Sequence, residues 1–225
     1  MAPRATPAGS ALEFFPALES LGVVRHGFIG RLPGIDVATD RAEALARLGE
    51  SHRALRTELG VGDMFFATAE QVHGKEIALV SEPAGEERCF SGVDGLVTAQ
   101  PGISLGIYVA DCCAVFLVDP VRNAIGLVHS GKKGTALSIV THAIAKMQAA
   151  FGSAPPDLVV QLSPCIRPPH YEIDFAAEIV RQLRAAGVQQ VHDAGRCTAC
   201  DLGRYYSYRA ERARTGRMLA LLALR

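Results

Sequence analysis

The chain has 225 residues, 49% of them hydrophobic, and its 23 basic residues balance its 23 acidic residues. This apolar content is enough for a sizeable core and excludes an intrinsically disordered chain. Because no long run of either charge occurs, the sequence predicts binding neither to nucleic acid nor to a membrane surface. A small anionic substrate is still compatible with it, because the charge of a local pocket does not show in the total.

The N-terminal residues contain one arginine among the first ten and no apolar stretch, so they do not resemble a secretory signal. Residues 1–18 are predicted as a disordered or irregular lead, and residues 19–225 as one domain. The apolar stretches 103–118 and 218–224 are too short or too interrupted to cross a bilayer. We therefore expect a cytoplasmic monomer whose six cysteines stay reduced and act as ligands, nucleophiles or core residues.

Taken in chain order, the first predicted elements are a strand within residues 21–29 and a helix over residues 40–59. Leucines in the second segment recur near helical spacing, Asp40 stands where an N-cap is needed, and Gly60 stands where the helix should end. Shorter strands are expected over residues 64–67, 77–80 and 94–98.

The densest strand signal lies in the middle of the chain. Two β-rich runs, 103–109 and 114–118, are followed by the turn residues Asp119-Pro120 and by another apolar run over 124–128, which predicts a hairpin. No internal repeat or linker stands out, so we expect one mixed α/β domain. The remaining predicted elements are a helix over 135–151, a strand over 158–162, a helix over 175–186 and a final helix over 205–222.

Three segments far apart in the chain each place one metal-binding side chain beside a glycine or a carboxylate. Two imidazoles and one thiolate suit zinc and also copper, and three protein ligands leave a position open, as in catalytic zinc sites. Asp111 could orient a ligand or shuttle a proton. Singly, such residues are more often turn or core residues, so spacing alone leaves the site a hypothesis. The segments are Gln71-Val72-His73-Gly74, Ala110-Asp111-Cys112 and Val128-His129-Ser130-Gly131.

A metal-independent interpretation uses the same residues. Cys112 could be a nucleophile and His129 its base, with Asp111 or Asp94 orienting the base, as in a cysteine hydrolase acting on an amide or ester. Because neighbouring side chains on a strand alternate between faces, Cys112 and Cys113 cannot both point into one cleft, and the other is expected in the core.

Two further motifs could be functional sites or ordinary loop segments. Cys197-Thr198-Ala199-Cys200 has zinc-knuckle spacing but no second pair, so Cys165, His170 or His192 would have to complete it, and simple loop cysteines are the alternative. Gly131-Lys132-Lys133-Gly134 precedes a predicted helix and could cradle a phosphate, or be a solvated turn. Its spacing is not that of a Walker loop.

Seven short motifs in this order make the chain resemble the bacterial laccase-domain family from about His26-Gly27-Phe28 to the C-terminus. Proteins of that family are described both as multicopper polyphenol oxidases and as purine nucleoside phosphorylases with adenosine deaminase activity. The motifs are Gln71-Val72-His73-Gly74, Asp94-Gly95-Leu96-Val97-Thr98, Ala110-Asp111-Cys112, Asp119-Pro120, Val128-His129-x-Gly131, Pro164-Cys165-Ile166 and Tyr171-Glu172.

The resemblance implies an α+β fold, a mixed α/β/β/α sandwich related to the catalytic domain of cytotoxic necrotizing factor. It also implies zinc bound by His73, Cys112 and His129, with Cys112, Asp111 and His129 as the catalytic residues. Arg31, Gln71 and Lys133 are predicted from their positions to bind the substrate. The expected partners are a nucleoside and phosphate.

The sequence departs from the family pattern beside the second histidine. His129-Ser130-Gly131-Lys132-Lys133-Gly134 stands where the family usually has His-Ala-Gly-Trp-Arg-Gly. This removes an aromatic stacking surface, and Lys133 lacks the bidentate fork that arginine offers to phosphate. Ala114 replaces a usual proline, and Ser163 a usual glycine. The metal ligands are retained, but the substrate preference need not be.

The leading functional prediction is a zinc-dependent purine nucleoside phosphorylase, with adenosine deamination as a second activity of the same site. The alternative is a copper-dependent polyphenol oxidase, which needs several copper centres and therefore many histidines. This chain has seven, of which two belong to the predicted site. A third hypothesis is the cysteine hydrolase, and removal of the metal separates it from the zinc enzyme, because the hydrolase should keep its activity and the zinc enzyme should lose it.

Overall fold

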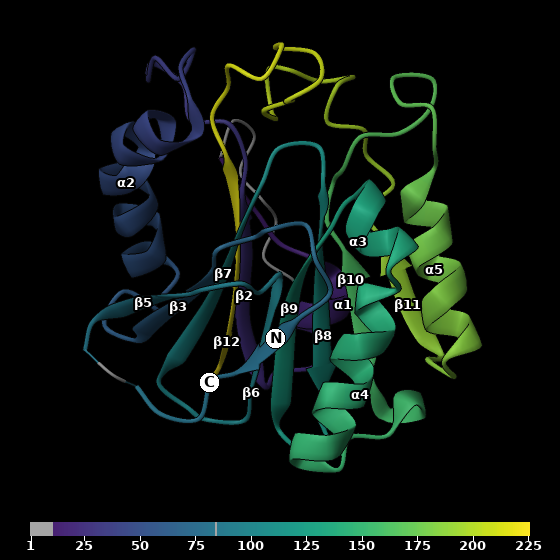
Figure 1. Cartoon of the computed structure of the whole chain (residues 1–225). Helices are drawn as coiled ribbons and strands as arrows, with labels where there is room; N and C mark the ends of the chain where they lie inside the picture. Colours follow the sequence, from purple (N-terminus) through teal and green to yellow (C-terminus); the bar gives the residue numbers. More distant parts are fainter. Residues whose placement is uncertain (1–10, 84) are drawn as a thin grey trace.

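The computed structural model describes residues 11–83 and 85–225. Its strands form two mixed six-stranded sheets that pack face to face between layers of helix (Figure 1). The predicted α/β/β/α sandwich is therefore confirmed. The first sheet has the order β1 (Leu12–Glu13), β2 (Val24–Ile29), β12 (Met218–Leu224), β7 (Ile103–Val109), β3 (Phe65–Ala69) and β5 (Glu87–Phe90). The second has the order β11 (Gln190–Asp193), β10 (Val159–Leu162), β8 (Cys113–Asp119), β9 (Ala124–Ser130), β6 (Gly95–Thr98) and β4 (Ile77–Leu79).

Helices cover the outer face of each sheet. The long helix α2 (Arg41–Glu58) covers the first sheet, where the guanidinium of Arg56 lies 3.7 Å from the ring centre of Phe66. Asp40 caps this helix, since its side chain accepts a hydrogen bond from the backbone N–H of Glu43. The second sheet is covered by α3 (Lys132–Ala136), α4 (Ile139–Phe151) and α5 (Phe175–Ala185). The remaining short elements are α1 (Pro16–Glu19) and a 3₁₀ turn, Pro155–Asp157.

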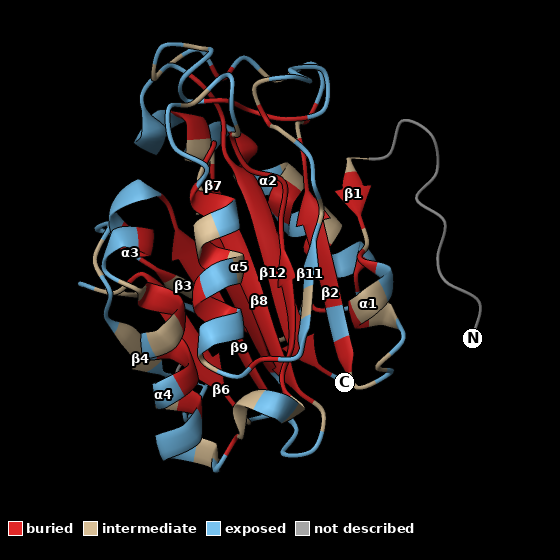
Figure 2. Ribbon diagram, turned by 90° about the vertical axis from the view of Figure 1, so that its right-hand side faces the viewer, coloured by how far each residue is buried: buried red, intermediate tan, exposed pale blue. Residues whose placement is uncertain are grey.

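Strand β8 shows why the central strands have continuous apolar sequences. Cys113, Val115 and Leu117 pack toward the helices, whereas Ala114, Phe116 and Val118 pack between the sheets. Both faces are buried, so polar residues do not alternate with apolar ones along the strand. Figure 2 shows the same burial along the neighbouring strands, with exposed residues on the outer sides of the helices, on the edge strand β11 and in the loops.

The predicted helix over residues 205–222 is wrong. Met218–Leu224 is the strand β12, which pairs antiparallel with β2 on one side and with β7 on the other. Leucine and alanine favour helices, but every residue of this segment is buried in the middle of the first sheet. Pairing with distant strands therefore overrides the local preference for a helix. Residues 205–217, which precede β12, form irregular turns.

Two other predictions need adjustment. The single helix expected over 135–151 is two helices, because Ser138 adopts a left-handed conformation (φ 55°) between α3 and α4. The lead expected over residues 1–18 is structured in its second half, since Leu12 and Leu18 are buried in β1 and α1. Residues 1–10 of that lead lie outside the described residues. Within residues 11–83 and 85–225, helices fall short of the length and hydropathy needed to span a membrane.

Candidate functional site

The topology of the second sheet brings the predicted ligand segments to one end of it. β9 lies between β8 and β6 and runs antiparallel to both, so its last residues lie beside the first residues of its two neighbours. His129 stands near the end of β9, Cys112 immediately precedes β8, and Asp94 immediately precedes β6. Three positions far apart in the sequence therefore meet.

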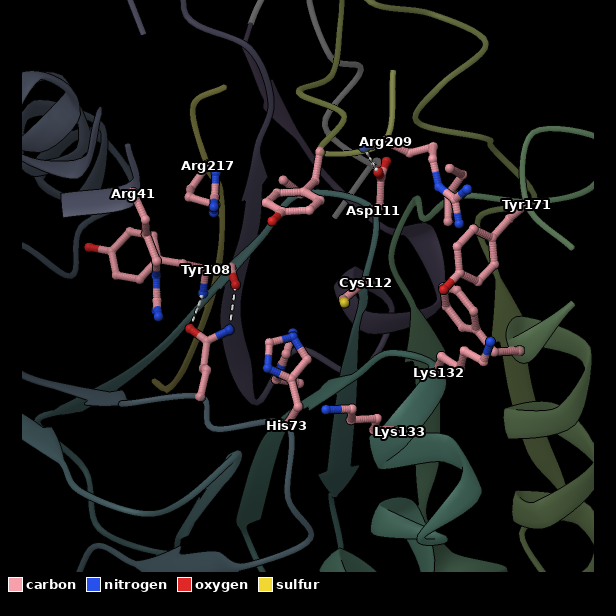
Figure 3. Close-up of a pocket in the computed structure, with 16 residues that line it drawn as sticks. Arg41, His73, Tyr108, Asp111, Cys112, Lys132, Lys133, Tyr171, Arg209 and Arg217 are labelled. Carbon is pink, nitrogen blue, oxygen red and sulfur yellow. Dashed lines mark hydrogen bonds between the residues drawn. The ribbon is translucent and has the colours of Figure 1, made fainter. Parts of the chain in front are cut away.

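His73, Cys112 and His129 lie close enough to share one metal ion. One ligand atom from each of the three lies within 4.8 Å of the other two. The imidazole rings of His73 and His129 are 4.9 Å apart at their centres and nearly perpendicular. His73 and Cys112 point into the same space in Figure 3. This is the set of donors that suits a three-ligand zinc site.

A buried carboxylate organises the site. The Oδ1 atom of Asp94 lies 2.8 Å from Nδ1 of His129 and accepts a hydrogen bond from the backbone N–H of His73 (2.9 Å). Its Oδ2 atom accepts one from the N–H of Gly74 (2.7 Å). Burial alone would raise the pKa of Asp94, but these bonds keep the pKa below its ordinary value. With Nδ1–H given to the carboxylate, Nε2 is the nitrogen of His129 that can bind a metal at the pocket, once the metal displaces its proton.

The turn that carries His73 has an unfavourable backbone conformation. Gln71 and His73 both have positive φ angles, 65° and 61°, which side chains other than glycine rarely adopt. The turn is anchored by Asp94 and also by the side-chain amide of Gln71, which bonds the backbone N–H (3.1 Å) and C=O (2.5 Å) of Tyr108. Such strain persists only where surrounding contacts enforce it, and it is common at functional sites.

Cys112 is positioned by its neighbours on both sides. Asp111 has a φ of 81°, and its carboxylate accepts hydrogen bonds from the Thr198 hydroxyl and the Arg209 backbone N–H, both at 2.7 Å. A Cβ atom added to Gly131 would lie 2.4 Å from the Cys112 sulfur, so any other residue there would displace the sulfur. The side chain of Cys113 points to the opposite, buried face, as the alternation predicts.

The thiol and the imidazole of the site shift each other's protonation. Burial by itself raises the pKa of Cys112, but His129 and His73 stabilise the thiolate and bring the pKa down to about 6. Burial likewise lowers the pKa of His129, but the Cys112 thiolate and Asp94 raise it to about 9. The site therefore stabilises a thiolate, which is the form of cysteine that binds zinc.

A pocket of about 760 Å³ lies over these ligands (Figure 3), a volume suited to a small organic ligand. Five cationic side chains line it, and we call them the cationic wall. The carboxylate of Glu172 forms ion pairs with two of them, Lys132 (3.2 Å) and Arg209 (3.1 Å). The pocket therefore favours an anion, although the net charge of the chain is zero. The cationic wall consists of Arg41, Lys132, Lys133, Arg209 and Arg217.

Four aromatic side chains line the pocket, namely Tyr108, Tyr171, Phe175 and Tyr208. Phe175 and Tyr171 come from α5 and the loop before it, and Tyr208 from the C-terminal turns. Tyr108 lines the pocket from β7, and burial raises its pKa to about 12, so its phenol stays protonated at neutral pH. The pocket thus combines surfaces for stacking a flat ring with charges for an anion.

Two of the three residues predicted to bind substrate line the pocket, and the third does not. Gln71 and Lys133 line the pocket, although the amide of Gln71 is engaged by the β7 backbone. Arg31 lies outside the pocket lining, since its guanidinium pairs with Glu211 (2.8 Å) and stacks 4.4 Å from the ring centre of Tyr206. It supports the packing of the C-terminal turns, and the geometry gives its predicted substrate contact no support.

Most of the cationic wall is not foreseen by motif reasoning. Arg41 begins α2, Arg209 lies within the irregular C-terminal turns, and Arg217 directly precedes β12, so none of them belongs to a ligand motif. The sequence points to these arginines only through an excess of arginine and tyrosine over residues 204–217. The prediction of a helix in this segment conceals that excess.

Comparison with known proteins places the chain in a family. The family model of the multi-copper polyphenol oxidoreductase laccases matches residues 25–180 and 172–225. The chain belongs to this laccase family. The resemblance read from seven motifs is therefore confirmed over nearly the whole sequence.

Curated relatives of this laccase-family chain are named purine nucleoside phosphorylases. YlmD of Geobacillus stearothermophilus is 30% identical over 230 aligned residues, covering 85% of this chain and 82% of the relative. The Deinococcus radiodurans protein is 31% identical over 235 residues, covering 89% of each. The crystal structure of YlmD covers 94% of both chains with a TM-score of 0.77 at 27% identity. That of Bacillus licheniformis YfiH, at 24% identity and a TM-score of 0.76, supports the fold alone.

Proposed function

We propose that this protein is a zinc-dependent purine nucleoside phosphorylase whose zinc is bound by His73, Cys112 and His129. The observation that carries the proposal is the position of these three ligands at one pocket with the cationic wall and several aromatic rings. The names of the relatives support the same reaction class. The reaction would join phosphate to the anomeric carbon of the ribose while the bond from that carbon to the purine breaks.

The residues of the pocket can be assigned to the parts of such a substrate. Lys133 and Arg209 of the cationic wall would bind phosphate and raise its local concentration. Tyr171 and Tyr208 would stack on the purine, and closing the pocket around both excludes water that would otherwise compete with phosphate. Because the sugar gains positive charge as the bond breaks, a bound anion beside it lowers the barrier.

The three ligands fit zinc on structural grounds. Cys112 is stabilised as a thiolate, and Asp94 fixes the tautomer of His129 so that Nε2 is available. Zinc with three protein ligands supplies a Lewis acid with an open position. Copper accepts the same donors, but multicopper oxidation needs several centres, and this site contains two of the seven histidines.

One specific contact favours a second candidate, a metal-independent cysteine hydrolase. The carboxylate of Asp94 bonds His129, and His129 in turn lies against the Cys112 thiolate. This is the order of orienting acid, base and nucleophile found in cysteine hydrolases. Asp94, rather than Asp111, would be the orienting group, because the Asp111 carboxylate is engaged by Thr198 and Arg209.

The test is phosphate-dependent turnover of adenosine and inosine by tag-free protein before and after zinc removal. We expect release of free purine that requires phosphate, is lost with zinc and returns when zinc is added back. Ammonia release from adenosine would report the deaminase activity. The variant His129→Ala should be inactive, whereas His142→Ala, an exposed histidine on α4, serves as control. Phosphate-dependent turnover that survives full zinc removal would contradict the proposal. Zinc-independent hydrolysis of an ester that Cys112→Ala lacks would instead support the hydrolase.

A further inference from the structure

A second group of metal-binding side chains lies outside the site described above. Cys197 and Cys200 face His170 across two loops, and one ligand atom from each lies within 4.8 Å of the other two. The Nδ1 atom of His170 is 3.4 Å from the sulfur of Cys200 and 3.8 Å from that of Cys197. Both cysteines are free, and Cys200 and His170 are exposed to solvent.

These distances are those expected around a tetrahedral zinc ion. Zinc binds sulfur at about 2.3 Å and nitrogen at about 2.0–2.1 Å, which places a sulfur and a nitrogen ligand about 3.5–3.6 Å apart. The two observed distances fall on either side of this value. Two cysteines separated by two residues are also the spacing by which one turn supplies two ligands to zinc.

The folded chain selects one of the three residues that could complete the Cys-x-x-Cys pair. Cys165 is fully buried and contacts Cys197 through the backbone, and His192 lies on the edge strand β11. Only His170 joins the two cysteines in a group of three. The cluster shares no residue with the site formed by His73, Cys112 and His129.

A metal ion at this position would cross-link two loops that support the pocket. The loop after β10 contains His170 and, next to it, the pocket residue Tyr171. The second loop contains both cysteines and Thr198, whose hydroxyl donates to the Asp111 carboxylate (2.7 Å) beside Cys112. The two loops are already paired through the backbone, since the N–H of Thr198 donates to the carbonyl of Cys165 (3.2 Å).

We propose that His170, Cys197 and Cys200 form a second zinc site, with water in the fourth position because the cluster is exposed to solvent. It stabilises the loops behind the pocket and takes no part in the chemistry at Cys112. The proposal is independent of the nucleoside reaction, because it rests on a separate set of ligands.

The experiment is the zinc content of tag-free protein, purified with a phosphine reductant and dialysed against buffered micromolar zinc. We expect two zinc ions per chain in the wild type, and one each in Cys200→Ser and in Cys112→Ala. Cys89→Ser, which changes another exposed free cysteine away from both clusters, should retain two. The variant His170→Asn alters a side chain on the surface and should also lose one zinc without loss of fold.

The outcomes separate this proposal from the first one. If Cys200→Ser and His170→Asn bind as much zinc as the wild type, the second site is refuted, whatever the nucleoside assay shows. If the wild type has no nucleoside turnover but both variants lose one zinc, the second site stands and the proposed reaction fails. Cobalt substitution gives an independent readout. The sulfur-to-cobalt absorption of Cys112→Ala, with two thiolates remaining, should be about twice that of Cys200→Ser, with one at the catalytic ligands.

Discussion

The Oδ1 atom of the buried residue Asp94 lies 2.8 Å from Nδ1 of His129, which lines the pocket. The same carboxylate also accepts the backbone N–H groups of His73 and Gly74, so one side chain orients one imidazole and positions the turn that carries the other. Such indirect contacts control how well ligands are presented to a metal.

Asp94→Asn is expected to weaken zinc binding at the pocket by about 10–100-fold, the usual cost of losing a partner of a histidine ligand. The amide has one accepting oxygen and one NH2 group, so either the side of His129 and His73 or the N–H of Gly74 faces a donor instead of an acceptor, and the negative charge that favours Nδ1–H on His129 is lost. Zinc affinity is measured by competition with a chromophoric chelator. Asp63→Asn, on the surface, should match the wild type. An unchanged affinity in Asp94→Asn would remove Asp94 from the site.

Gly131→Ala and Gly49→Ala should act in opposite directions. The added methyl of the first would lie 2.4 Å from the Cys112 sulfur, so the thiolate must move and zinc content and turnover should both fall. The second lies in α2 with no atom within 4 Å of the added Cβ, and should stabilise the protein by about 0.5–1 kcal/mol. Thermal unfolding and zinc content of both variants check this. Full zinc occupancy in Gly131→Ala would contradict the packing argument.

Lys133→Ala is expected to raise KM for phosphate about tenfold or more, since a hydrogen bond to a charged group contributes about 1.5–3 kcal/mol. Lys133→Arg should keep a low KM, because the guanidinium offers a bidentate fork to the same anion. Lys146→Ala on α4, outside the pocket lining, is the control. Steady-state kinetics with phosphate varied at saturating nucleoside give the values. A rise in nucleoside KM alone would place the phosphate elsewhere.

The reactivity of Cys112 in metal-free protein should depend on pH in a defined way. Its pKa is lowered to about 6, so the thiol form predominates below pH 6 and the reactive thiolate above it. Because the pKa of His129 is raised to about 9, the imidazolium that stabilises the thiolate persists up to that pH. Alkylation by iodoacetamide should therefore show a step near pH 6 that Cys112→Ala lacks and that bound zinc suppresses. A step above pH 8 would argue against the thiolate–imidazolium pair.

Most strands can be predicted from local patterns, because β-branched and apolar runs bounded by turn residues occur wherever a buried strand is needed. The segment Met218–Leu224 is the exception. Its leucine and alanine content favours a helix, and because both faces of β12 are buried, no polar alternation identifies it as a strand. Pairing with β2 and β7, two distant segments, decides its structure.

The chemistry of the two ligand groups can be read from the sequence by itself, since histidine and cysteine beside glycine or in a Cys-x-x-Cys spacing carry their coordination properties wherever they lie. Their grouping depends on the tertiary structure. His170 joins Cys197 and Cys200, Asp94 rather than Asp111 orients His129, and Arg41 meets Arg209 and Arg217 at one pocket. Distance along the chain does not encode distance in space. Residue type therefore identifies the candidate metal ligands. The cationic wall around them forms only because the two sheets and the loops at their ends pack together.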